Sequence, residues 1–376
     1  MKKILFYESR PEWGGAQKCE LELLLALEEE ALETYFVTST NGPMNNRVKA
    51  AGKRLTVIPI NDNVNQIRKE QVKSGIFFLL SQFVHILPHL YKVFLFMMRN
   101  RIDFVYTSQF RSQLIIGWLA KLLGRKVIWH IHGEEKLNNL LGGIGIFFAD
   151  KIIVVSHAIA DKYRKLYPKQ QAKFVVVHNG LDIPAPVETK KKPPFTICMI
   201  GTLVAGKRQD LAIKACAKLN RMGYQVQLKI LGEKPPWHSD DYKNSLLDLT
   251  HRLDCFQSVL FLGWVEKPWP HLHQSDVFIL PSDTEGLPLS IIEAMALGLP
   301  VISTKVGGVP ELIEEAKTGF MIHPGKVDEL VDKLKLLYDQ PYLRKQIGQQ
   351  AQKRYEHHFT KESFVKGVAG VINTIQ

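Results

Sequence analysis

Short apolar runs rich in β-branched and aromatic residues alternate with amphipathic stretches along the whole chain. This alternation predicts strands joined by helices, the organisation of parallel α/β sheets. In the first half, the expected strands are 4–7, 34–39, 54–60, 103–108, 126–132, 151–156 and 174–179. In the second half, they are 195–201, 225–232, 258–263, 276–282, 300–304 and 319–324. We therefore expect an α/β protein with two Rossmann-like, doubly wound domains whose strand ends face a central cleft.

Helical periodicity separates most of these runs. Residues 21–30 have amphipathic spacing, and residues 113–124 end on a glycine, a typical helix stop. The longest apolar stretch, residues 76–98, is interrupted by polar residues and by Pro88. A membrane span needs about 20 nearly uncharged apolar residues, so we expect two shorter helices that are broken at Pro88.

The composition changes abruptly at residues 184–194, which carry four prolines and three consecutive lysines. Such a segment is typical of a linker. We therefore expect a first domain over residues 1–185, a linker over 186–194 and a second domain over 195–355. The remaining residues, 356–376, are expected to form a helix that packs back on the first domain.

The length of 376 residues favours two domains, and an apolar content of 45% is ordinary for a globular protein. The four cysteines form no CxxC pair, which argues against a zinc site or a disulfide framework. Four apolar residues follow the first three residues, whereas a secretory signal needs roughly 7–15. We therefore expect a cytoplasmic protein.

The net charge of +12 is unevenly distributed, because residues 1–185 hold 25 Lys and Arg against 16 Asp and Glu. A basic first half favours an anionic partner, with a soluble basic surface as the alternative. The stretch 68–101 is both apolar and basic, and its cations are Arg68, Lys69, Lys73, Lys92, Arg99 and Arg101. We expect peripheral contact with the anionic inner face of a membrane, against the alternative of a buried helix pair with basic ends. The aromatic residues are not interleaved with the basic clusters, so no nucleic-acid partner is expected.

The most informative stretch is EGLPLSIIE, residues 285–293, which follows an expected strand and carries two glutamates eight positions apart. A helix starting near Pro288 would present its N-terminal amides at the carboxyl edge of the sheet, where a phosphate can bind. Glu293 lies among apolar residues, where a carboxylate is costly unless hydroxyl groups, such as those of a ribose, satisfy it. The alternative is a surface glutamate on an amphipathic helix and a second one in a loop.

A second candidate is GTLVAGKRQD, residues 201–210, in which a strand ends at Gly201 and Lys207 and Arg208 precede a helix. Cations at a strand–helix turn suit a diphosphate, although a charged loop without a ligand is an equal reading. The spacing is not that of a Walker A loop.

The first half offers weaker candidates. The first strand runs into Gly14 and Gly15 before a helix, which resembles a phosphate turn without being GxGxxG, and a turn without ligand remains open. His132 stands at the end of another strand, just before a glycine. The histidines at 130, 178, 271 and 273 have no ligand-like grouping with carboxylates, so we expect no metal.

Taken together, these segments resemble the retaining glycosyltransferases of family 4, which have the GT-B fold. The resemblance covers nearly the whole chain and is most specific over residues 276–320, which match the family's Glu-x7-Glu region in residue type and spacing. The stretches VVSHAIA, HNGLD and GTLVAGKRQD match in the right order, as do GGAQ and HIHG in the first half.

The resemblance implies roles for these residues. Glu293 would hold the donor ribose, Glu285 the transferred sugar, and Lys207 the leaving diphosphate. The implied catalytic residues are Lys207, Glu285 and His132. The implied donor-binding residues are Gly14, Gly15, Gly201, Thr202, Lys207, Arg208, Gly263, Glu285, Gly286, Leu287, Pro288 and Glu293. Thr202 departs from the family, which often has an arginine there to pair with the phosphates.

The expected activity is transfer of a sugar from a UDP-sugar or GDP-sugar to a glycan or lipid-linked acceptor. The resemblance implies retention of anomeric configuration, no cofactor or metal, and a place in cell-surface polysaccharide or glycolipid synthesis. Two alternatives stay open. One keeps the fold and changes the chemistry, as in a nucleotide-sugar epimerase or, less compatibly with this length, a phosphorylase. The other is a non-catalytic module that binds nucleotide-sugar, and Thr202 is its support.

Overall fold

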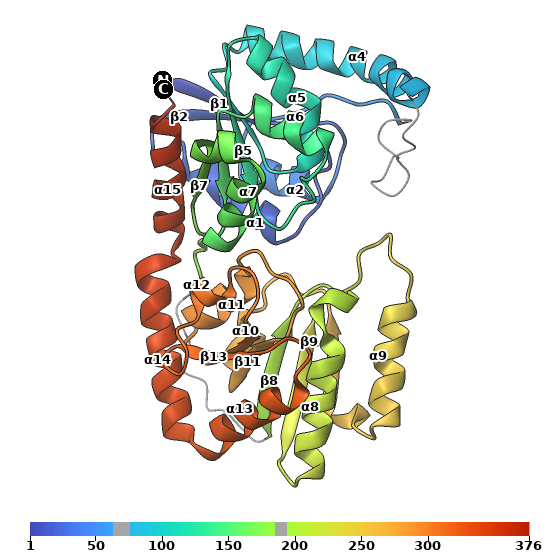
Figure 1. The fold of residues 1–376 in the computed structure, drawn as a ribbon, viewed down its shortest axis with the longest axis vertical. Helices are drawn as coiled ribbons and strands as arrows, with labels where there is room; N and C mark the ends of the chain where they lie inside the picture. The colour runs from blue at the N-terminus through green and yellow to red at the C-terminus, as the bar shows by residue number, and fades with distance from the viewer. Residues whose placement is uncertain (63–75, 185–193, 376) are drawn as a thin grey trace. The chain divides into compact units, whose positions relative to one another are not determined.

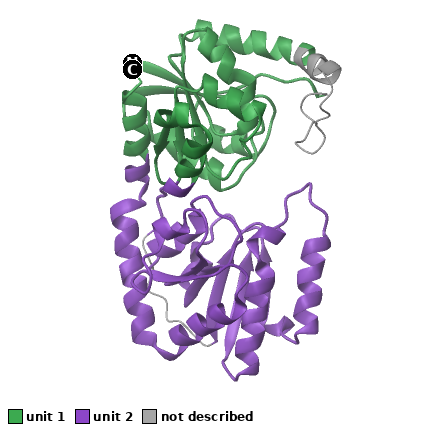
Figure 2. Ribbon diagram, viewed as in Figure 1, with its two compact units in different colours: residues 1–155, 159–178, 365–376 green, residues 156–158, 179–364 purple. Residues whose placement is uncertain are grey.

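The computed structural model describes residues 1–62, 76–184 and 194–375, and for residues 76–83 it describes the backbone alone. Most of the expected linker and the cations Arg68, Lys69 and Lys73 lie outside the described residues. Two compact units are present (Figure 2). Unit 1 comprises residues 1–155, 159–178 and 365–376, and unit 2 comprises residues 156–158 and 179–364.

Unit 1 is built on a parallel seven-stranded sheet with the order β3-β2-β1-β4-β5-β6-β7 (Figure 1). Its strands are β1 (Lys2–Glu8), β2 (Leu32–Thr38), β3 (Leu55–Val57), β4 (Phe104–Thr107), β5 (Lys126–Ile131), β6 (Lys151–Val154) and β7 (Phe174–Val176). Its helices are α1 (Gly15–Ala26), α2 (Pro43–Ala50), α4 (Ile76–Arg99), α5 (Phe110–Leu122), α6 (Leu140–Phe148) and α7 (His157–Leu166). The first two residues of α7 belong to unit 2, and the rest of the helix, from Ile159, belongs to unit 1. The inner strands β4, β5 and β6 are almost entirely buried, which explains why they read as continuous apolar runs.

Unit 2 is built on a parallel six-stranded sheet with the order β10-β9-β8-β11-β12-β13. Its strands are β8 (Phe195–Ile200), β9 (Val226–Leu231), β10 (Val259–Gly263), β11 (Val277–Leu280), β12 (Val301–Thr304) and β13 (Gly319–Ile322). Its helices are α8 (Gln209–Arg221), α9 (Asp241–Arg252), α10 (Trp269–His273), α11 (Leu289–Ala296), α12 (Val309–Leu312), α13 (Val327–Asp339) and α14 (Pro341–His358). Every strand expected from the sequence overlaps an observed one, so the predicted α/β class with two Rossmann-like domains is confirmed.

Both sheets reverse their strand order at one point, between β1 and β4 in unit 1 and between β8 and β11 in unit 2. The helices that follow two such neighbouring strands lie on opposite faces of the sheet, which leaves a crevice at the carboxyl ends of the strands. Ligands of doubly wound folds bind there. The topology therefore predicts a ligand site at the loops that follow β8 and β11.

The expected break at Pro88 is wrong, because α4 runs without interruption through this proline. Pro88 is exposed, so water can solvate the carbonyl group that loses its helical hydrogen bond. The next residue, His89, is buried, where its Nε2 atom accepts a hydrogen bond from Tyr7 Oη at 2.7 Å. Val93 and Met97 then pack in the core. These tertiary contacts outweigh the missing backbone bond. Among the described helices, none has both the length and the apolar character needed to cross a membrane.

The end of the chain also differs in detail from the expectation. Instead of one helix over residues 356–376, α14 ends at His358 and a separate helix, α15 (Lys361–Asn373), follows. From Val365 onward the chain belongs to unit 1, where a Cβ atom at Gly367 would lie only 2.7 Å from the side chain of Val177. The chain also passes between the units at 155/156, 158/159 and 178/179, so the long stretch of unit 2 begins at residue 179, before the expected boundary at 185.

Candidate active site

The site in unit 2 is centred on an ion pair between two loops that leave adjacent strands. Lys207 ends the loop after β8, and Glu285 lies in the loop after β11. The Lys207 Nζ atom lies 2.6 Å from Glu285 Oε1, and the glutamate side chain is only 7% exposed. The pair therefore stands at the carboxyl ends of the two strands between which the strand order reverses.

The turn after Glu285 leads directly into α11. This helix begins at Leu289, and Pro288 before it has an extended backbone, so the helix starts one residue later than the proline suggested. Gly286 is half-buried in the turn, whereas Leu287 and Pro288 are buried. The positive end of the helix dipole therefore faces the same strand edge as Lys207, and both favour a negatively charged group there.

Glu293 occupies the middle of α11 and is only 4% exposed. Its helical neighbours Ile292, Ala294 and Met295 are buried as well. The reading of Glu293 as a surface residue on an amphipathic helix is therefore wrong. A buried carboxylate is destabilising by several kcal/mol unless charged or hydrogen-bonding groups compensate it.

Further donor-site candidates lie on the neighbouring loops of unit 2. Gly201 directly follows β8, and the aliphatic part of the Lys207 side chain would contact a Cβ atom there at 3.7 Å. Thr202 is exposed. Gly263 ends β10 in a left-handed conformation with φ +66° and is followed by Trp264, which is 57% exposed. The structure thus brings Gly201 and Lys207 together with Glu285, while Gly263 lies on the outer strand of the same sheet.

The first-domain candidates form their own groups within unit 1. Gly14 and Gly15 lie at the start of α1, after β1. His132 follows β5, and its ring lies 3.9 Å, centroid to centroid, from that of His130. His130 is fully buried and hydrogen-bonds through Nδ1 to Tyr106 Oη. Burial and then the adjacent His132 hold the pKa of His130 well below its usual value, so His130 is neutral at physiological pH.

Comparison with known families decides the class of protein. The model for Glycosyltransferase Family 4 matches residues 13–184, and the model for Glycosyl transferases group 1 matches residues 184–354. Together they cover most of the chain, and their border falls between the two sheets. The chain belongs to the family 4 glycosyltransferases.

Two curated proteins and one solved structure illustrate what this glycosyltransferase is similar to. N-acetyl-alpha-D-glucosaminyl L-malate synthase of Bacillus anthracis is 27% identical over 288 residues, which are 71% of this chain and 73% of that protein. The capsular polysaccharide biosynthesis glycosyltransferase CapM of Staphylococcus aureus is 28% identical over 180 residues, 48% of this chain and 46% of that protein. The crystal structure of Anabaena Alr3699/HepE in complex with UDP covers all of this chain and of that one, with a TM-score of 0.82 at 20% identity.

The sequence reasoning missed two glycines that shape the turn of this glycosyltransferase. A Cβ atom at Gly307 would lie 1.7 Å from the carbonyl oxygen of Glu285, and one at Gly308 would lie 2.1 Å from that of Gly286. Gly308 N also donates a hydrogen bond to Gly286 O at 3.0 Å. The Gly-Gly pair after β12 was the available signal, and it allows the backbone to pack directly on the turn that carries Glu285.

The reasoning also missed a buried carboxyl pair at the strand reversal of unit 1. Glu8 and Glu20 are both fully buried, and Ser108 Oγ lies 3.0 Å from Glu20 Oε2 and bonds to Glu8 as well. Burial raises the pKa of Glu20 to about 7. Burial, and then the neighbouring Glu20, raise the pKa of Glu8 well above its usual value. The pair therefore retains a proton in the folded protein at pH values where the unfolded chain has lost it.

This pair predicts that unit 1 loses stability as pH rises from about 4.5 to about 7. In that range the folded state binds more protons than the unfolded state, so the contribution is full below the unfolded pKa and lost above the folded one. For Glu20 the shift corresponds to about 3 kcal/mol. Hydrogen exchange of the β1 segment at pH 5.5 and pH 8, corrected for intrinsic rates, measures this loss of stability. The double variant Glu8→Gln/Glu20→Gln should remove most of the difference between the two pH values, and an equal pH dependence in wild type and double variant would contradict the prediction.

Proposed function

We propose that this glycosyltransferase moves a sugar from a nucleoside diphosphate sugar to a glycan or lipid-linked acceptor, with retention of anomeric configuration. The observation that carries the proposal is the Lys207–Glu285 pair at the strand reversal of unit 2. A cation, a carboxylate and a helix N-terminus meet there. The cation and the helix N-terminus suit a diphosphate, and the carboxylate suits a sugar with several hydroxyl groups.

Lys207 and the N-terminus of α11 have the chemistry for the leaving group. In the transfer, the bond between the anomeric carbon and the diphosphate oxygen breaks, and negative charge grows on the phosphate oxygens. Preorganised cations and backbone amides stabilise such charge without reorganisation. Because these groups supply the positive charge, the reaction is proposed to need no metal. The departing phosphate takes the proton of the acceptor hydroxyl group, which attacks from the side that the phosphate leaves.

Glu285 and Glu293 have separate roles in this proposal. Glu285 accepts hydrogen bonds from hydroxyl groups of the transferred sugar. Glu293, buried on α11, accepts them from the ribose, and bonds to an ionised acceptor are stronger than neutral ones. The exposed Trp264 after Gly263 offers an aromatic face near the end of β10 for the base. In unit 1, His132 is proposed to lie near the reacting sugar, and Gly14 and Gly15 near the diphosphate and the acceptor.

A donor panel with product analysis tests the proposal. Purified protein is incubated with UDP-sugars and GDP-sugars, with and without glycan and polyprenyl-phosphate acceptors, and in the presence of EDTA. The expected result is acceptor-dependent release of UDP or GDP, unaffected by EDTA, and an NMR coupling constant showing the donor's anomeric configuration in the product. Inverted product would overturn retention. Acceptor-independent sugar conversion would favour an epimerase, and binding without turnover would favour the non-catalytic module.

The outer face of α4 supports a peripheral site at the inner face of the cell membrane. Leu90, Val93 and Met97 of this helix are buried in unit 1. The opposite face exposes apolar residues three, four and seven positions apart, which are Val84, Leu87, Tyr91 and Met98. Lys92 and Arg99 are exposed beside this stripe. An apolar stripe with flanking cations is typical of helices that lie in an anionic lipid surface, where they also meet lipid-linked acceptors.

Loss of the two α4 cations is expected to weaken membrane binding about 30-fold, since each cation near an anionic surface contributes about 1 kcal/mol. Co-sedimentation with phosphatidylglycerol vesicles, comparing wild type with a Lys92→Gln/Arg99→Gln variant, measures the effect. A Lys49→Gln/Lys126→Gln variant, which removes two exposed cations on α2 and β5, is the matched control. Equal losses in the two variants would show that only total charge matters, and would contradict a specific role for α4.

A further inference from the structure

Arg208 has an unusual backbone conformation beside the candidate active site. It stands between Lys207 and α8 with φ +56° and ψ +43°, in the left-handed region. A long side chain with a Cβ atom is uncommon there, and glycine is the usual occupant. Such strain persists only where the surrounding structure imposes it, and it concentrates at functional sites.

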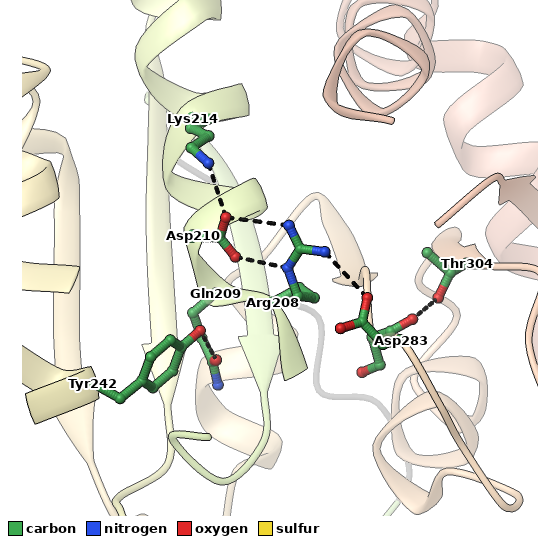
Figure 3. A network of polar contacts seen from close by, with 8 residues as sticks. Arg208, Gln209, Asp210, Lys214, Tyr242, Asp283 and Thr304 are labelled. Carbon is green, nitrogen blue, oxygen red and sulfur yellow. Dashed lines mark hydrogen bonds and ion pairs between the residues drawn. The ribbon is translucent and has the colours of Figure 1, made fainter. Parts of the chain in front are cut away.

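The guanidinium group of Arg208 joins two carboxylates from different segments (Figure 3). Its Nε and Nη2 atoms donate to the two oxygens of Asp210, at 3.0 and 3.4 Å, and its Nη1 atom donates to Asp283 Oδ1 at 3.1 Å. Asp210 lies in the first turn of α8, and Asp283 lies in the loop after β11. The planar group with fixed N–H directions suits such a double bridge better than a lysine would.

The bridge connects the same two loops that carry the Lys207–Glu285 pair. Arg208 follows Lys207 directly, and Asp283 precedes Glu285 by two residues. The backbone adds a second link, because Asp283 N donates to Gly206 O at 2.9 Å. Gln209 fixes the beginning of the β8 loop, since its Nε2 atom donates to Thr202 O at 3.0 Å. The two loops are therefore tied together next to the ion pair.

We propose that Arg208 is a positioning residue that acts through Lys207. The Arg208–Asp283 bridge fixes the two loops against each other and thereby sets the Lys207 ammonium group where a leaving diphosphate would bind. Three of the five guanidinium N–H groups already bond to carboxylates, so the effect on the reaction passes through the loop rather than through direct contact with the donor. This inference rests on the proposed function for the role of Lys207, but the bridge itself can be tested without it.

Chemical labelling of Lys207 tests the bridge independently of activity. The acetylation rate of Lys207 by N-hydroxysuccinimidyl acetate is measured by mass spectrometry in wild type, Asp283→Asn and Arg208→Gly. Asparagine keeps the size of Asp283, and glycine accepts the left-handed conformation, so both variants are expected to fold. The rate should rise at least threefold in both. Lys214→Gln is the control, because Lys214 bonds to Asp210 at 2.9 Å without joining the two loops.

Turnover then tests the consequence. If the wild type uses a donor, kcat/KM should fall at least tenfold in Asp283→Asn and in Arg208→Gly, with melting temperatures near that of the wild type. Arg208→Lys should recover part of the loss, and Lys214→Gln should not differ from wild type. Unchanged Lys207 labelling in Asp283→Asn would overturn the bridge. Increased labelling with unchanged turnover would overturn the positioning role. A wild type without any donor turnover would refute the proposed function. The labelling rates would then still test whether the bridge fixes Lys207.

Discussion

Sugar transfer by a Lys207→Met variant is expected to be about 100- to 1,000-fold slower than by the wild type, the range for loss of one preorganised donor to a developing oxyanion. The ammonium group is the cation that contacts Glu285 at 2.6 Å, at the point where strand order reverses. Methionine retains a flexible chain of similar length without the charge. Single-turnover measurements at saturating donor give the chemical step.

Removing Lys207 also deprives Glu285, whose side chain is 7% exposed, of this ionic partner. A carboxylate left this way destabilises the protein, so a lower melting temperature is expected in Lys207→Met. The double variant Lys207→Met/Glu285→Gln should recover most of that stability and none of the rate. A double variant that regained both, or a single variant that lost stability but no rate, would show that Lys207 supports the fold and not the reaction.

A Glu293→Ala variant is expected to lose the stabilisation that a nucleotide gives the wild type. A ligand at 100 times its dissociation constant stabilises by about 2.7 kcal/mol, which is readily seen as a shift in melting temperature. Hydrogen bonds to a charged group contribute about 1.5–3 kcal/mol each, so removal of the carboxylate should weaken nucleotide binding by at least tenfold. Thermal melts with UDP and GDP at fixed concentration measure the shift in both proteins.

Two further variants make the Glu293 result specific. Glu293→Gln keeps the shape of the side chain and should retain part of the nucleotide effect. Asp328→Asn removes an exposed carboxylate on α13 and should retain all of it. If the folded Glu293→Ala protein gained as much stability from a nucleotide as the wild type, the buried carboxylate would have no part in donor binding.

The fold could be read from the sequence because the inner strands of both sheets are buried. Strands such as 126–131 and 151–154 therefore appear as unbroken apolar runs, whose positions a pattern analysis recovers. The failure at Pro88 has the opposite origin. Proline usually breaks a helix, but here the packing of His89 and its neighbours keeps α4 continuous. The sequence does not display this packing.

The candidate site was predictable only in its separate segments. Both loops were recognisable by their residue types, but 78 residues separate Lys207 from Glu285, and their contact follows from the strand order. The Arg208–Asp283 bridge could not be predicted from the sequence, because no sequence signal marks an arginine with a left-handed backbone. The Glu8–Glu20 pair was missed for a similar reason: nothing in the sequence shows that Glu8, at the end of β1, lies next to Glu20. Only the packing of α1 on the sheet buries it.

Turnover of nucleoside diphosphate sugars by the wild type is the most direct test of the transferase proposal. A panel of UDP-sugars and GDP-sugars is incubated with the protein and with glycan and lipid-linked acceptors, and release of the nucleoside diphosphate is followed by chromatography. One donor is expected to be consumed in an acceptor-dependent manner, at a rate that Lys207→Met lowers at least about 100-fold. If the folded wild type consumes none of these donors with any acceptor, or if Lys207→Met consumes them equally fast, the proposed function is contradicted.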